Sequence, residues 1–394
     1  MKILLVTSFP PSRGDLNEYG YHLACSLQNN PQVDLVILAD ETDDKNELEG
    51  FPVERCWRFD SMSNPLRLLS AIRKHNPDVV WFNIGFSTFA RNPLAAFLAL
   101  TVPGFARLSG CYTHITLHTI FERINLQDAG VRWPALYRTA GHLGTQLLLL
   151  ANDVSVLLPS FRDDLEVRYG KRANRVQFRP HGTFDSSNHE KPIAAKSSER
   201  IILAFGYWGT YKRVDLLLDS MDEVVRSVPN AVLVIAGTNH PSTPGYLESM
   251  QKQSAGRSCV RFLGYVPETG LPELFSSASV LALPYTSAAG TSGVMHQACQ
   301  YGLPMVASSI PEIVEIAGQE KIAVEFYPPG DARTLAAQLI RVLTSDQLHR
   351  RASQQNLLAA GLTPISEVTA GYVQFFQNRV FRSVPIPGRQ VITQ

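Results

Sequence analysis

The length, composition and charge of the chain limit its architecture and its class of partner. With 394 residues it is too long for one ordinary hydrophobic core, and we expect two domains of similar size. Its 45% apolar residues, 18% charged residues and formal charge of +1 are typical of a soluble globular protein, and they give no support to a nucleic-acid-binding or polybasic membrane-binding chain.

The N-terminus has the pattern of a first β-strand. The opening MKILLVTSFPP has one lysine and a short apolar run, and its prolines come where a signal peptide would need more hydrophobic length. The longest apolar stretch, Pro93 to Leu108, is interrupted by Pro103, Gly104 and Arg107. It is therefore too short and too broken to span a bilayer.

The five cysteines indicate a reducing compartment. They are far apart and form no CxxC pair that could hold zinc or shuttle electrons, so we interpret them as small buried residues: Cys25, Cys56, Cys111, Cys259 and Cys299. We therefore predict a cytoplasmic protein. A peripheral membrane contact stays open.

Short β-branched runs alternate with helical patterns through the first half. Several of the runs are continuously apolar, as strands covered on both faces must be. The candidate strands are Lys2 to Thr7, Val33 to Leu38, Asp78 to Asn83, Ile115 to His118 and Asp153 to Leu158. This alternation predicts a doubly wound parallel sheet, and we place the first domain at residues 1–182.

One helical pattern lies between two of these strands. It starts at Pro134, and its apolar residues recur at helical spacing: Leu136, Ala140, Leu143, Leu147 and Leu150. We interpret it as an ordinary packing helix.

A second alternating series follows a polar linker. Residues 180–200 are rich in Ser, Pro, Lys and Glu, and we place the linker at 183–200. The later candidate strands are Ile201 to Phe205, Ala231 to Ala236, Val260 to Leu263, Val280 to Leu283, Pro304 to Ala307 and Ala323 to Phe326. They predict a second doubly wound domain at 201–365. Residues 366–394 are predicted to contain a helix that could cross back to the first domain, followed by a tail. Since ligands of such sheets bind outside the carboxyl ends of the strands, we expect a site in a cleft where the two sheets face each other.

A loop of small residues after the strand Val280 to Leu283 has the composition of a phosphate site. It leads into a helix predicted from about Gly293 to Tyr301, with Gly302 as its C-cap. Small residues let backbone amides approach a ligand, and the helix N-terminus adds about half a positive charge. An ordinary strand-to-helix turn, which any α/β domain contains, explains the pattern equally well.

A basic pair follows the first strand of the second domain. In AFGYWGTYKRVDLLLDS, Lys212 and Arg213 come just before a helix that begins near Val214, so their cationic groups could reach an anion. Lysine before a helix is usually solvated surface. Both loops, however, follow strands of one sheet at the same carboxyl edge.

The first domain offers fewer candidates. His118 closes a strand, where it could donate to a substrate hydroxyl or leaving oxygen, and Gly14 lies in the turn after the first strand. A capped polar side chain in a loop is the alternative for His118. His114 shares a strand face with His118, but two imidazoles without a nearby carboxylate make a poor metal site. The basic run RYGKRANRVQFR could touch a phosphorylated or membrane-bound acceptor, or be a solvated face.

Taken together, these stretches resemble the retaining, nucleotide-sugar-dependent glycosyltransferases of GT-B fold that are called family four. The resemblance covers most of the chain and is strongest from Ile201 to Val324. There AFGYWGTYKRVDLLLDS, AVLVIAGT, VRFLGYVPETGLPELFSSASVLALPY and SGVMHQACQYGLPMVASSIPEI follow the family's order and approximate spacing. The first domain agrees through the glycine turn, His118 and the PHG before the linker.

The resemblance implies a donor sugar nucleotide on the second domain and an acceptor on the first, with no metal and no cofactor beyond the co-substrate. Lys212 and His118 would be catalytic, Lys212 on the donor diphosphate and His118 against the donor sugar. The expected contacts with diphosphate and sugar are Gly14, Gly206, Arg213, Gly290, Thr291, Ser292, Gly293 and Val294. The expected nucleoside contacts are Gly264, Tyr285 and Gln297.

Three positions depart from the family pattern. A glutamate usually begins the glycine-rich loop and a second follows eight positions later, but here they align with Ala289 and Gln297. The amide of Gln297 can still hydrogen-bond a ribose, whereas Ala289 cannot hold a sugar hydroxyl. An arginine common after the glycine of the Lys212 loop is replaced by Tyr207.

The resemblance implies a hexosyltransferase that acts with retention of anomeric configuration. Its donor would be a UDP-, GDP- or ADP-sugar, and its acceptor a saccharide or lipid-linked molecule in polysaccharide or cell-envelope assembly. Two alternatives stay open: a nucleotide-sugar epimerase, and a catalytically impaired glycosyltransferase-like binding subunit, which Ala289 favours.

Overall fold

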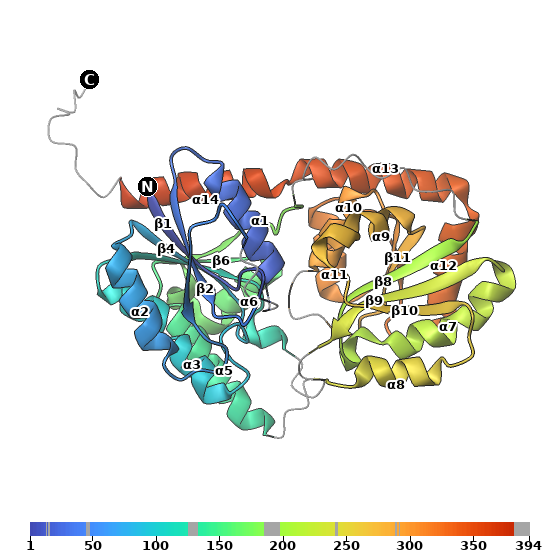
Figure 1. Ribbon diagram of the computed structural model, residues 1–394, viewed down its shortest axis with the longest axis horizontal. Helices are drawn as coiled ribbons and strands as arrows, with labels where there is room; N and C mark the ends of the chain where they lie inside the picture. The colour runs from blue at the N-terminus through green and yellow to red at the C-terminus, as the bar shows by residue number, and fades with distance from the viewer. Residues whose placement is uncertain are drawn as a thin grey trace. The chain divides into compact units, whose positions relative to one another are not determined.

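The computed structural model describes residues 1–12, 14, 16–44, 48–124, 133–184, 198–240, 243–287, 290 and 292–381. The chain divides into two units (Figure 1). Unit 1 contains residues 1–121, 136–180 and 365–394, and unit 2 contains residues 122–135 and 181–364. Of the predicted linker, residues 185–197 lie outside the described residues, and Thr183 and Phe184 belong to unit 2.

Unit 1 is built on a seven-stranded parallel sheet in the order β3-β2-β1-β4-β5-β6-β7. The strands are β1 (Lys2–Val6), β2 (Asp34–Asp40), β3 (Val53–Trp57), β4 (Val79–Ile84), β5 (Tyr112–Leu117), β6 (Asp153–Val156) and β7 (Val176–Phe178). The helices are α1 (Asn17–Gln28), α2 (Asn64–His75), α3 (Pro93–Ala99), α4 (Val102–Leu108), α5 (Pro134–Leu148), α6 (Pro159–Tyr169) and α14 (Ile365–Val380).

Unit 2 is built on a six-stranded parallel sheet in the order β10-β9-β8-β11-β12-β13. The strands are β8 (Arg200–Trp208), β9 (Ala231–Asn239), β10 (Val260–Gly264), β11 (Val280–Leu283), β12 (Met305–Ser308) and β13 (Val324–Tyr327). The helices are α7 (Val214–Ser227), α8 (Tyr246–Gln253), α9 (Leu271–Ser277), α10 (Gly293–Gln300), α11 (Pro311–Gln319), α12 (Ala332–Thr344) and α13 (Asp346–Leu362). Side chains of α7 and α12 pack on one face of this sheet as its main core.

The predicted α/β class with two doubly wound parallel sheets is confirmed. All eleven candidate strands are present within a few residues of their predicted bounds, whereas β3 and β7 were not predicted. These two strands are the edges of the first sheet. Charged Glu54 and Arg55 interrupt the apolar residues of β3, and β7 lies inside a basic run. An edge strand is covered on fewer sides, so it lacks the continuous apolar run that marks a central strand.

The apolar stripe of α5 faces outward, which corrects the interpretation of this segment as an ordinary packing helix. Leu136 is 66% exposed, Leu143 46% and Leu150 51%. The buried side of α5 consists instead of Gly141, Gly144, Thr145 and Leu148. Helical spacing therefore identified an apolar face correctly but not what covers it.

Helix α14 packs on unit 1 through aromatic side chains. The Tyr372 ring centroid lies 4.5 Å from that of Trp81, and the Phe376 centroid lies 5.0 Å from that of His114. Arg379 at the end of the helix pairs with the buried carboxylate of Asp153 at 2.8 Å. His114 is thus a core histidine whose pKa is lowered by burial.

Replacing Phe376 with leucine should lower the free energy of unfolding by about 1–2 kcal/mol. The buried Phe376 ring packs among five aromatic side chains, and leucine cannot fully replace these contacts. Phe381→Leu is the control, since Phe381 is 53% exposed and should change stability by less than about 0.5 kcal/mol. Urea denaturation followed by circular dichroism measures both, and equal midpoints for the two variants would contradict this packing.

No helix in the described part of the chain is both long and apolar enough to cross a lipid bilayer.

Candidate active site

The carboxyl ends of β8 and β11 lie at the point where the strand order of the second sheet reverses. β8 pairs with β9 on one side and with β11 on the other. Ligands of doubly wound sheets bind at such a switch point. A backbone hydrogen bond of 2.8 Å from the Thr286 amide to the Tyr211 carbonyl joins the loops that follow the two strands.

The Lys212 side chain lies against the first turn of α10. Its Nζ atom is 3.0 Å from the place that a Cβ atom on Gly206 would take, and Val294 Cγ2 is 3.8 Å from the same place. Because both atoms adjoin one point, the ammonium group and the N-terminal end of α10 are neighbours. The structure therefore brings together the two loops that the sequence proposed for one anion.

Aromatic rings surround the Lys212 ammonium. Nζ lies 5.1 Å from the ring centroid of Tyr285 and 5.9 Å from those of Trp208 and Tyr211. Tyr285 is buried, which raises the pKa of its hydroxyl well above the usual range. Neutral ring faces stabilise a cation without neutralising its charge.

Glycines let the backbone at the end of β8 approach its neighbour. Gly206 has φ 137° and Gly237 on β9 has φ 111°, both in the region that favours glycine. A Cβ atom on Gly237 would lie 1.9 Å from the Gly206 carbonyl oxygen. A larger residue at 237 would therefore displace the strand end that positions Lys212.

The N-terminus of α10 presents backbone amides. Its N-cap residue, Ser292, is extended and makes no side-chain capping hydrogen bond, and the first turn contains no acidic residue. Gly293 and Val294 are half-buried, and no neighbouring atom lies within 4 Å of a Cβ on Gly293. Such a terminus can hold a phosphate. Gly290 is also half-buried, while Ala289 and Thr291 lie outside the described residues.

Arg213 already has an acidic partner, which changes what can be expected of it. Its Nε donates to both carboxylate oxygens of Asp215, at 3.0 and 2.9 Å, and its Nη2 lies 2.8 Å from Oδ2. The hydrogen bond with Asp215 raises the pKa of the guanidinium. Its charge is therefore largely neutralised by Asp215, and the proposed help with a diphosphate falls mainly to Lys212.

The predicted nucleoside residues lie on three different elements. Gly264 ends β10 with φ 68° and has open space where a side chain would be. Tyr285 follows β11, and Gln297 is buried in the second turn of α10. Their assignment to a nucleoside stays a prediction. Tyr207, at the end of β8, is 40% exposed.

His118 lies in unit 1, directly after β5. Its Nε2 is 2.6 Å from Asn83 Oδ1, and Asn83 Nδ2 donates to Thr7 Oγ1 at 3.0 Å. Since the Asn83 amide group donates to Thr7, its oxygen faces the histidine and Nε2 carries the hydrogen. Burial lowers the pKa of His118 to about 3, so the imidazole is neutral. Its Nε2–H is directed at Asn83, and Nδ1 is an acceptor rather than the donor that the sequence reasoning expected.

Gly14 lies in a loop that is held by the buried carboxylate of Asp40. The Phe9 amide donates to Oδ1 at 3.0 Å, and the Ser12 hydroxyl donates to Oδ2. Burial raises the pKa of Asp40, and these hydrogen bonds partly offset the increase. A Cβ atom on Gly14 would lie 2.9 Å from Asp40 Oδ2, so a side chain does not fit there.

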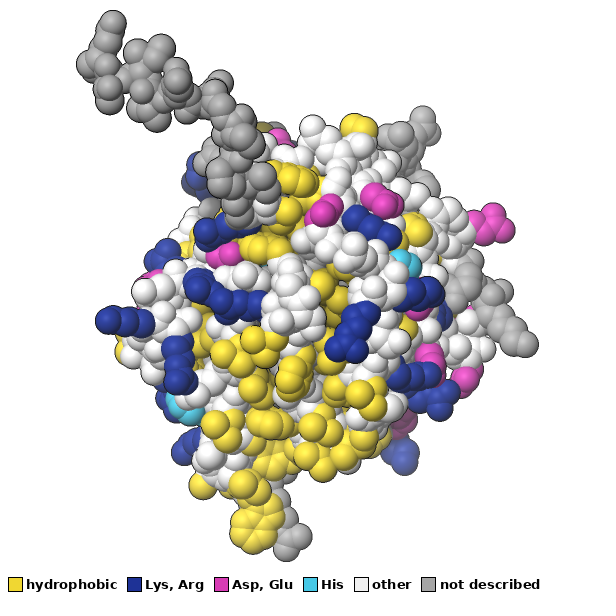
Figure 2. All heavy atoms as spheres, turned by 90° about the vertical axis from the view of Figure 1, so that its left-hand side faces the viewer, with side chains coloured by type: hydrophobic (Ala, Val, Ile, Leu, Met, Phe, Trp, Pro, Cys, Tyr) yellow, Lys and Arg dark blue, Asp and Glu magenta, His cyan; other side chains and the backbone are white. Residues whose placement is uncertain are grey.

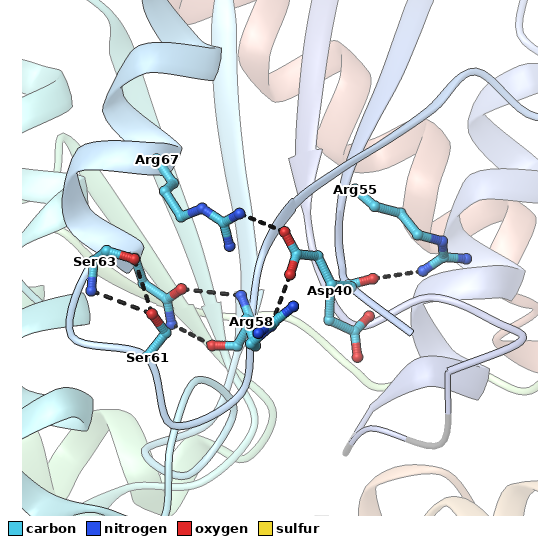
Figure 3. A network of polar contacts seen from close by, with 8 residues as sticks. Asp40, Arg55, Arg58, Ser61, Ser63 and Arg67 are labelled. Carbon is cyan, nitrogen blue, oxygen red and sulfur yellow. Dashed lines mark hydrogen bonds and ion pairs between the residues drawn. The ribbon is translucent and has the colours of Figure 1, made fainter. Parts of the chain in front are cut away.

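Arginines from β3 and α2 support this edge of unit 1. Arg55 donates to the main-chain carbonyl of Asp40 at 2.6 Å, as Figure 3 shows. The next residue, Glu41, accepts from Arg58 at 2.8 Å and from Arg67 at 2.5 Å. The loop after β1 is thus fixed by its neighbours, and a donor-binding role for Gly14 stays a prediction.

A buried histidine pair beneath α10 was not predicted. The His296 imidazole makes hydrogen bonds through both nitrogens, to the Ser292 carbonyl at 3.0 Å and to Glu320 Oε2 at 2.9 Å. The His181 ring stacks on it with centroids 4.2 Å apart. All three side chains are buried. The three residues are far apart in the sequence, and no motif connects them.

The contacts of His296 favour its charged form. The Ser292 carbonyl can only accept, so Nδ1 carries a hydrogen, and the Glu320 carboxylate accepts from Nε2. Burial lowers the pKa of His296, but the attraction and hydrogen bond of Glu320 together with the Ser292 carbonyl outweigh it and leave the pKa above its ordinary value of 6.5. The imidazole thus holds the N-cap carbonyl of α10, the helix whose first turn lies near Lys212.

Among the residues with described positions, no group of three or more His, Cys, Asp or Glu side chains comes together that could hold a metal ion.

Comparison with known proteins finds a likeness to glycosyltransferases over the segment that contains this geometry. Residues 199–345 match the family model described as Glycosyl transferases group 1. This group 1 match spans both β8 and α10, and so contains Lys212 and the helix beside it. An uncharacterized glycosyltransferase of Methanocaldococcus jannaschii is 32% identical over 142 residues, which are 36% of this chain and 35% of that protein's length.

A second relative and a solved structure extend the likeness to most of the chain. The GDP-mannose-dependent alpha-(1-6)-phosphatidylinositol monomannoside mannosyltransferase of Mycolicibacterium smegmatis is 25% identical over 332 residues, covering 77% of this chain and 80% of that protein. HepE of Anabaena, solved with UDP-glucose, superimposes with a TM-score of 0.71 at 15% identity over 96% of this chain and all of that chain. The likeness confirms the predicted GT-B fold. The expectation that the two sheets face each other across a cleft stays a prediction.

Proposed function

We propose that the chain is a hexosyltransferase that moves a sugar from a nucleotide-sugar donor to an acceptor with retention of anomeric configuration. The observation that carries the proposal is the place of Lys212 beside Gly206 and the Val294 side chain, at the N-terminal end of α10. The group 1 match over the same segment supports a glycosyltransferase reaction at this point.

The arrangement meets the main electrostatic demand of sugar transfer. When the bond between the sugar and the diphosphate breaks, negative charge develops on the leaving diphosphate. Lys212 and the α10 N-terminus would stabilise that charge more than they stabilise the ground state. Retention by attack on the same face needs this stabilisation and a positioned acceptor more than a dedicated nucleophile. His118 would orient a sugar hydroxyl as a neutral acceptor.

The relatives support part of the substrate range that we propose, the UDP and GDP donors. One carries GDP-mannose in its name and acts on a phosphatidylinositol monomannoside, and the solved structure holds UDP-glucose. We therefore propose a UDP-, GDP- or ADP-hexose as donor and a saccharide or lipid-linked acceptor. The reaction would serve polysaccharide or cell-envelope assembly, in the cytoplasm and at a membrane periphery.

A panel of sugar nucleotides tests the proposal. The full chain is incubated with UDP-, GDP- and ADP-hexoses, and slow hydrolysis of one donor is followed by release of its nucleoside diphosphate. Nuclear magnetic resonance then gives the anomeric configuration of the first-formed product, which should equal that of the donor. If no donor releases its nucleoside diphosphate, transferase function is contradicted. A product with inverted anomeric configuration would contradict retention.

We propose that transfer needs no resident metal, because Lys212 and the α10 amides supply the positive charge. Adding a chelator should therefore change the rate of donor hydrolysis by less than about twofold. Restoring Mg²⁺ or Mn²⁺ after chelation gives the control. A rate that disappears with the chelator and returns with one metal would show that an ion provides part of this charge.

A binding subunit with impaired catalysis is the second candidate. Ala289 and Gln297 stand where the family has glutamates, and Arg213 is bound by Asp215. A chain of this kind would bind a nucleoside diphosphate by calorimetry yet hydrolyse none of the donors. Donor turnover would exclude it, and a change in the donor sugar without transfer would indicate an epimerase instead.

A further inference from the structure

The hydroxyl of Tyr285 is buried and has no hydrogen-bond partner among the described residues. The side chain that carries it is only 4% exposed. Hydrophobic side chains do reach the surface elsewhere, as Figure 2 shows for one face of the molecule, and there water can satisfy a polar atom. A hydroxyl that is buried without a partner destabilises the free chain, so it is a candidate for contact with a ligand that supplies an acceptor.

This hydroxyl lies at the N-terminal end of α10. Burial raises its pKa, and the nearby Ser292 side chain acts in the opposite direction, although the two side chains do not meet the geometry of a hydrogen bond. Ser292 is the N-cap residue of α10, and it makes no side-chain capping hydrogen bond to the first turn. The Tyr285 hydroxyl and the amides of that turn are therefore donors at one end of one helix.

The Tyr285 ring lies against Lys212 and is held in place by its neighbours. The Lys212 Nζ atom is 5.1 Å from the ring centroid. The Thr286 amide and hydroxyl donate to the Tyr211 carbonyl at 2.8 and 3.2 Å, which ties the segment after β11 to the loop that carries Lys212. The Ser308 hydroxyl at the end of β12 donates to the Tyr285 carbonyl. The strands thus fix the main chain from which the ring projects.

The candidate diphosphate site lacks two of the donors that the family resemblance implies. Tyr207 occupies the place of the common arginine, and Arg213 is paired with Asp215 at 2.8–3.0 Å. Phosphate oxygens accept several hydrogen bonds, and a neutral hydroxyl supplies one without adding charge. A further donor beside Lys212 would therefore replace part of what is missing.

We propose that the Tyr285 hydroxyl donates a hydrogen bond to the diphosphate of the sugar nucleotide, beside Lys212 and the N-terminus of α10. This assigns Tyr285 to the diphosphate instead of the nucleoside. Because the pKa of the hydroxyl is raised, it stays protonated near neutral pH and acts toward an anion only as a donor. The inference rests on the proposed function, since it names a further contact of the same site.

Tyr285→Phe tests the hydroxyl alone, because phenylalanine keeps the ring that Lys212 contacts. Calorimetric titration of the full chain measures the binding of UDP, GDP and ADP. Each nucleotide that binds the wild type should bind Tyr285→Phe at least about tenfold more weakly. Inorganic pyrophosphate, added as a competitor, should lose affinity by the same factor, whereas a hydroxyl that contacts the nucleoside would leave pyrophosphate unaffected.

The thermal midpoint of the free chain gives a second readout. Removing a buried hydroxyl that has no partner should leave the midpoint of Tyr285→Phe unchanged or raise it by about 1–3 °C. A hydroxyl that only held the fold would lower the midpoint when it is removed. At the same nucleotide concentration, the midpoint should rise less in the variant than in the wild type, because the variant binds more weakly.

Tyr327→Phe is the matched control. Tyr327 ends β13, and its hydroxyl is likewise buried without a partner among the residues that the structure describes. Its ring packs in the main core of unit 2 with side chains of α7 and α12. The control should have the same or a higher midpoint than the wild type and should bind nucleotide and pyrophosphate with wild-type affinity.

Four results would overturn the inference. Equal affinities of the wild type and Tyr285→Phe would remove the hydroxyl from the site and leave the proposed function standing. A loss for the nucleotide without a loss for pyrophosphate would assign the hydroxyl to the nucleoside. A lower midpoint in Tyr285→Phe would show that the hydroxyl has a partner within the chain. If the wild type binds none of the three nucleotides, the proposed function fails and this inference fails with it.

Discussion

Replacing Lys212 with alanine should lower the turnover of the donor by about a hundredfold, which corresponds to about 3 kcal/mol in the transition state. The ammonium lies near the first turn of α10, and its Nζ atom is 5.1 Å from the ring centroid of Tyr285. Its charge would be felt most when the diphosphate leaves, so the loss should appear mainly in kcat rather than in KM.

The rate of nucleoside diphosphate release at saturating donor measures this effect. Lys252→Ala is the matched control, because Lys252 is exposed at the end of α8 in the same unit. It should leave kcat within about twofold of the wild type. Unchanged kcat in Lys212→Ala, with folding intact, would refute the assignment of Lys212 to the leaving group.

Replacing His296 with alanine should lower the free energy of unfolding by about 3–5 kcal/mol. The change removes the ring that bonds both the Ser292 carbonyl and the Glu320 carboxylate, and it leaves that buried carboxylate without its cation. The stacked His181 ring would also lose its neighbour. Because His296 holds the N-cap of α10, donor binding should weaken as well.

The contribution of His296 should depend on pH. Its pKa in the folded protein is raised above 6.5, so the stabilisation is fully present below the unfolded value and is lost as pH rises through the folded value. The free energy of unfolding of the wild type should therefore fall above neutral pH. In Glu320→Gln, this fall should be smaller, because the amide does not favour the charged imidazole.

Urea denaturation across a pH series measures both effects. The control is His349→Ala, which removes a half-buried histidine whose Nε2 lies 3.0 Å from the Ser279 carbonyl, and which should cost only about 1 kcal/mol. A wild type and a Glu320→Gln variant with the same pH dependence would contradict the ion pair.

The sequence predicted the second sheet almost completely, for a physical reason. Its four inner strands are mostly buried and carry apolar runs, whereas the edge strands β10 and β13 are only partly buried and contain Arg261 and Glu325 among apolar residues. Gly302 ended the α10 pattern where the helix ends. The edge strands β3 and β7 lacked this signal. The exposed apolar side chains of α5 show the opposite limit, since helical spacing is the same whether a stripe is buried or exposed.

The candidate site was predictable where it depends on the carboxyl edge of one sheet. Lys212 and Val294 follow neighbouring strands, so parallel topology alone brings them together. The pairing of Arg213 with Asp215 depends on a backbone at φ 40°, and the contact of His296 with Glu320 joins residues that are 24 positions apart. Neither depends on strand order, so sequence patterns could not show them.

Calorimetric titration of the full chain with UDP, GDP and ADP tests the central claim, that Lys212 and the α10 amides form one diphosphate site. The account predicts that at least one of the three nucleotides binds the wild type and that Lys212→Ala weakens this binding by about tenfold or more, while Lys252→Ala does not. Binding of none of them, or equal affinity in the wild type and Lys212→Ala, would contradict it.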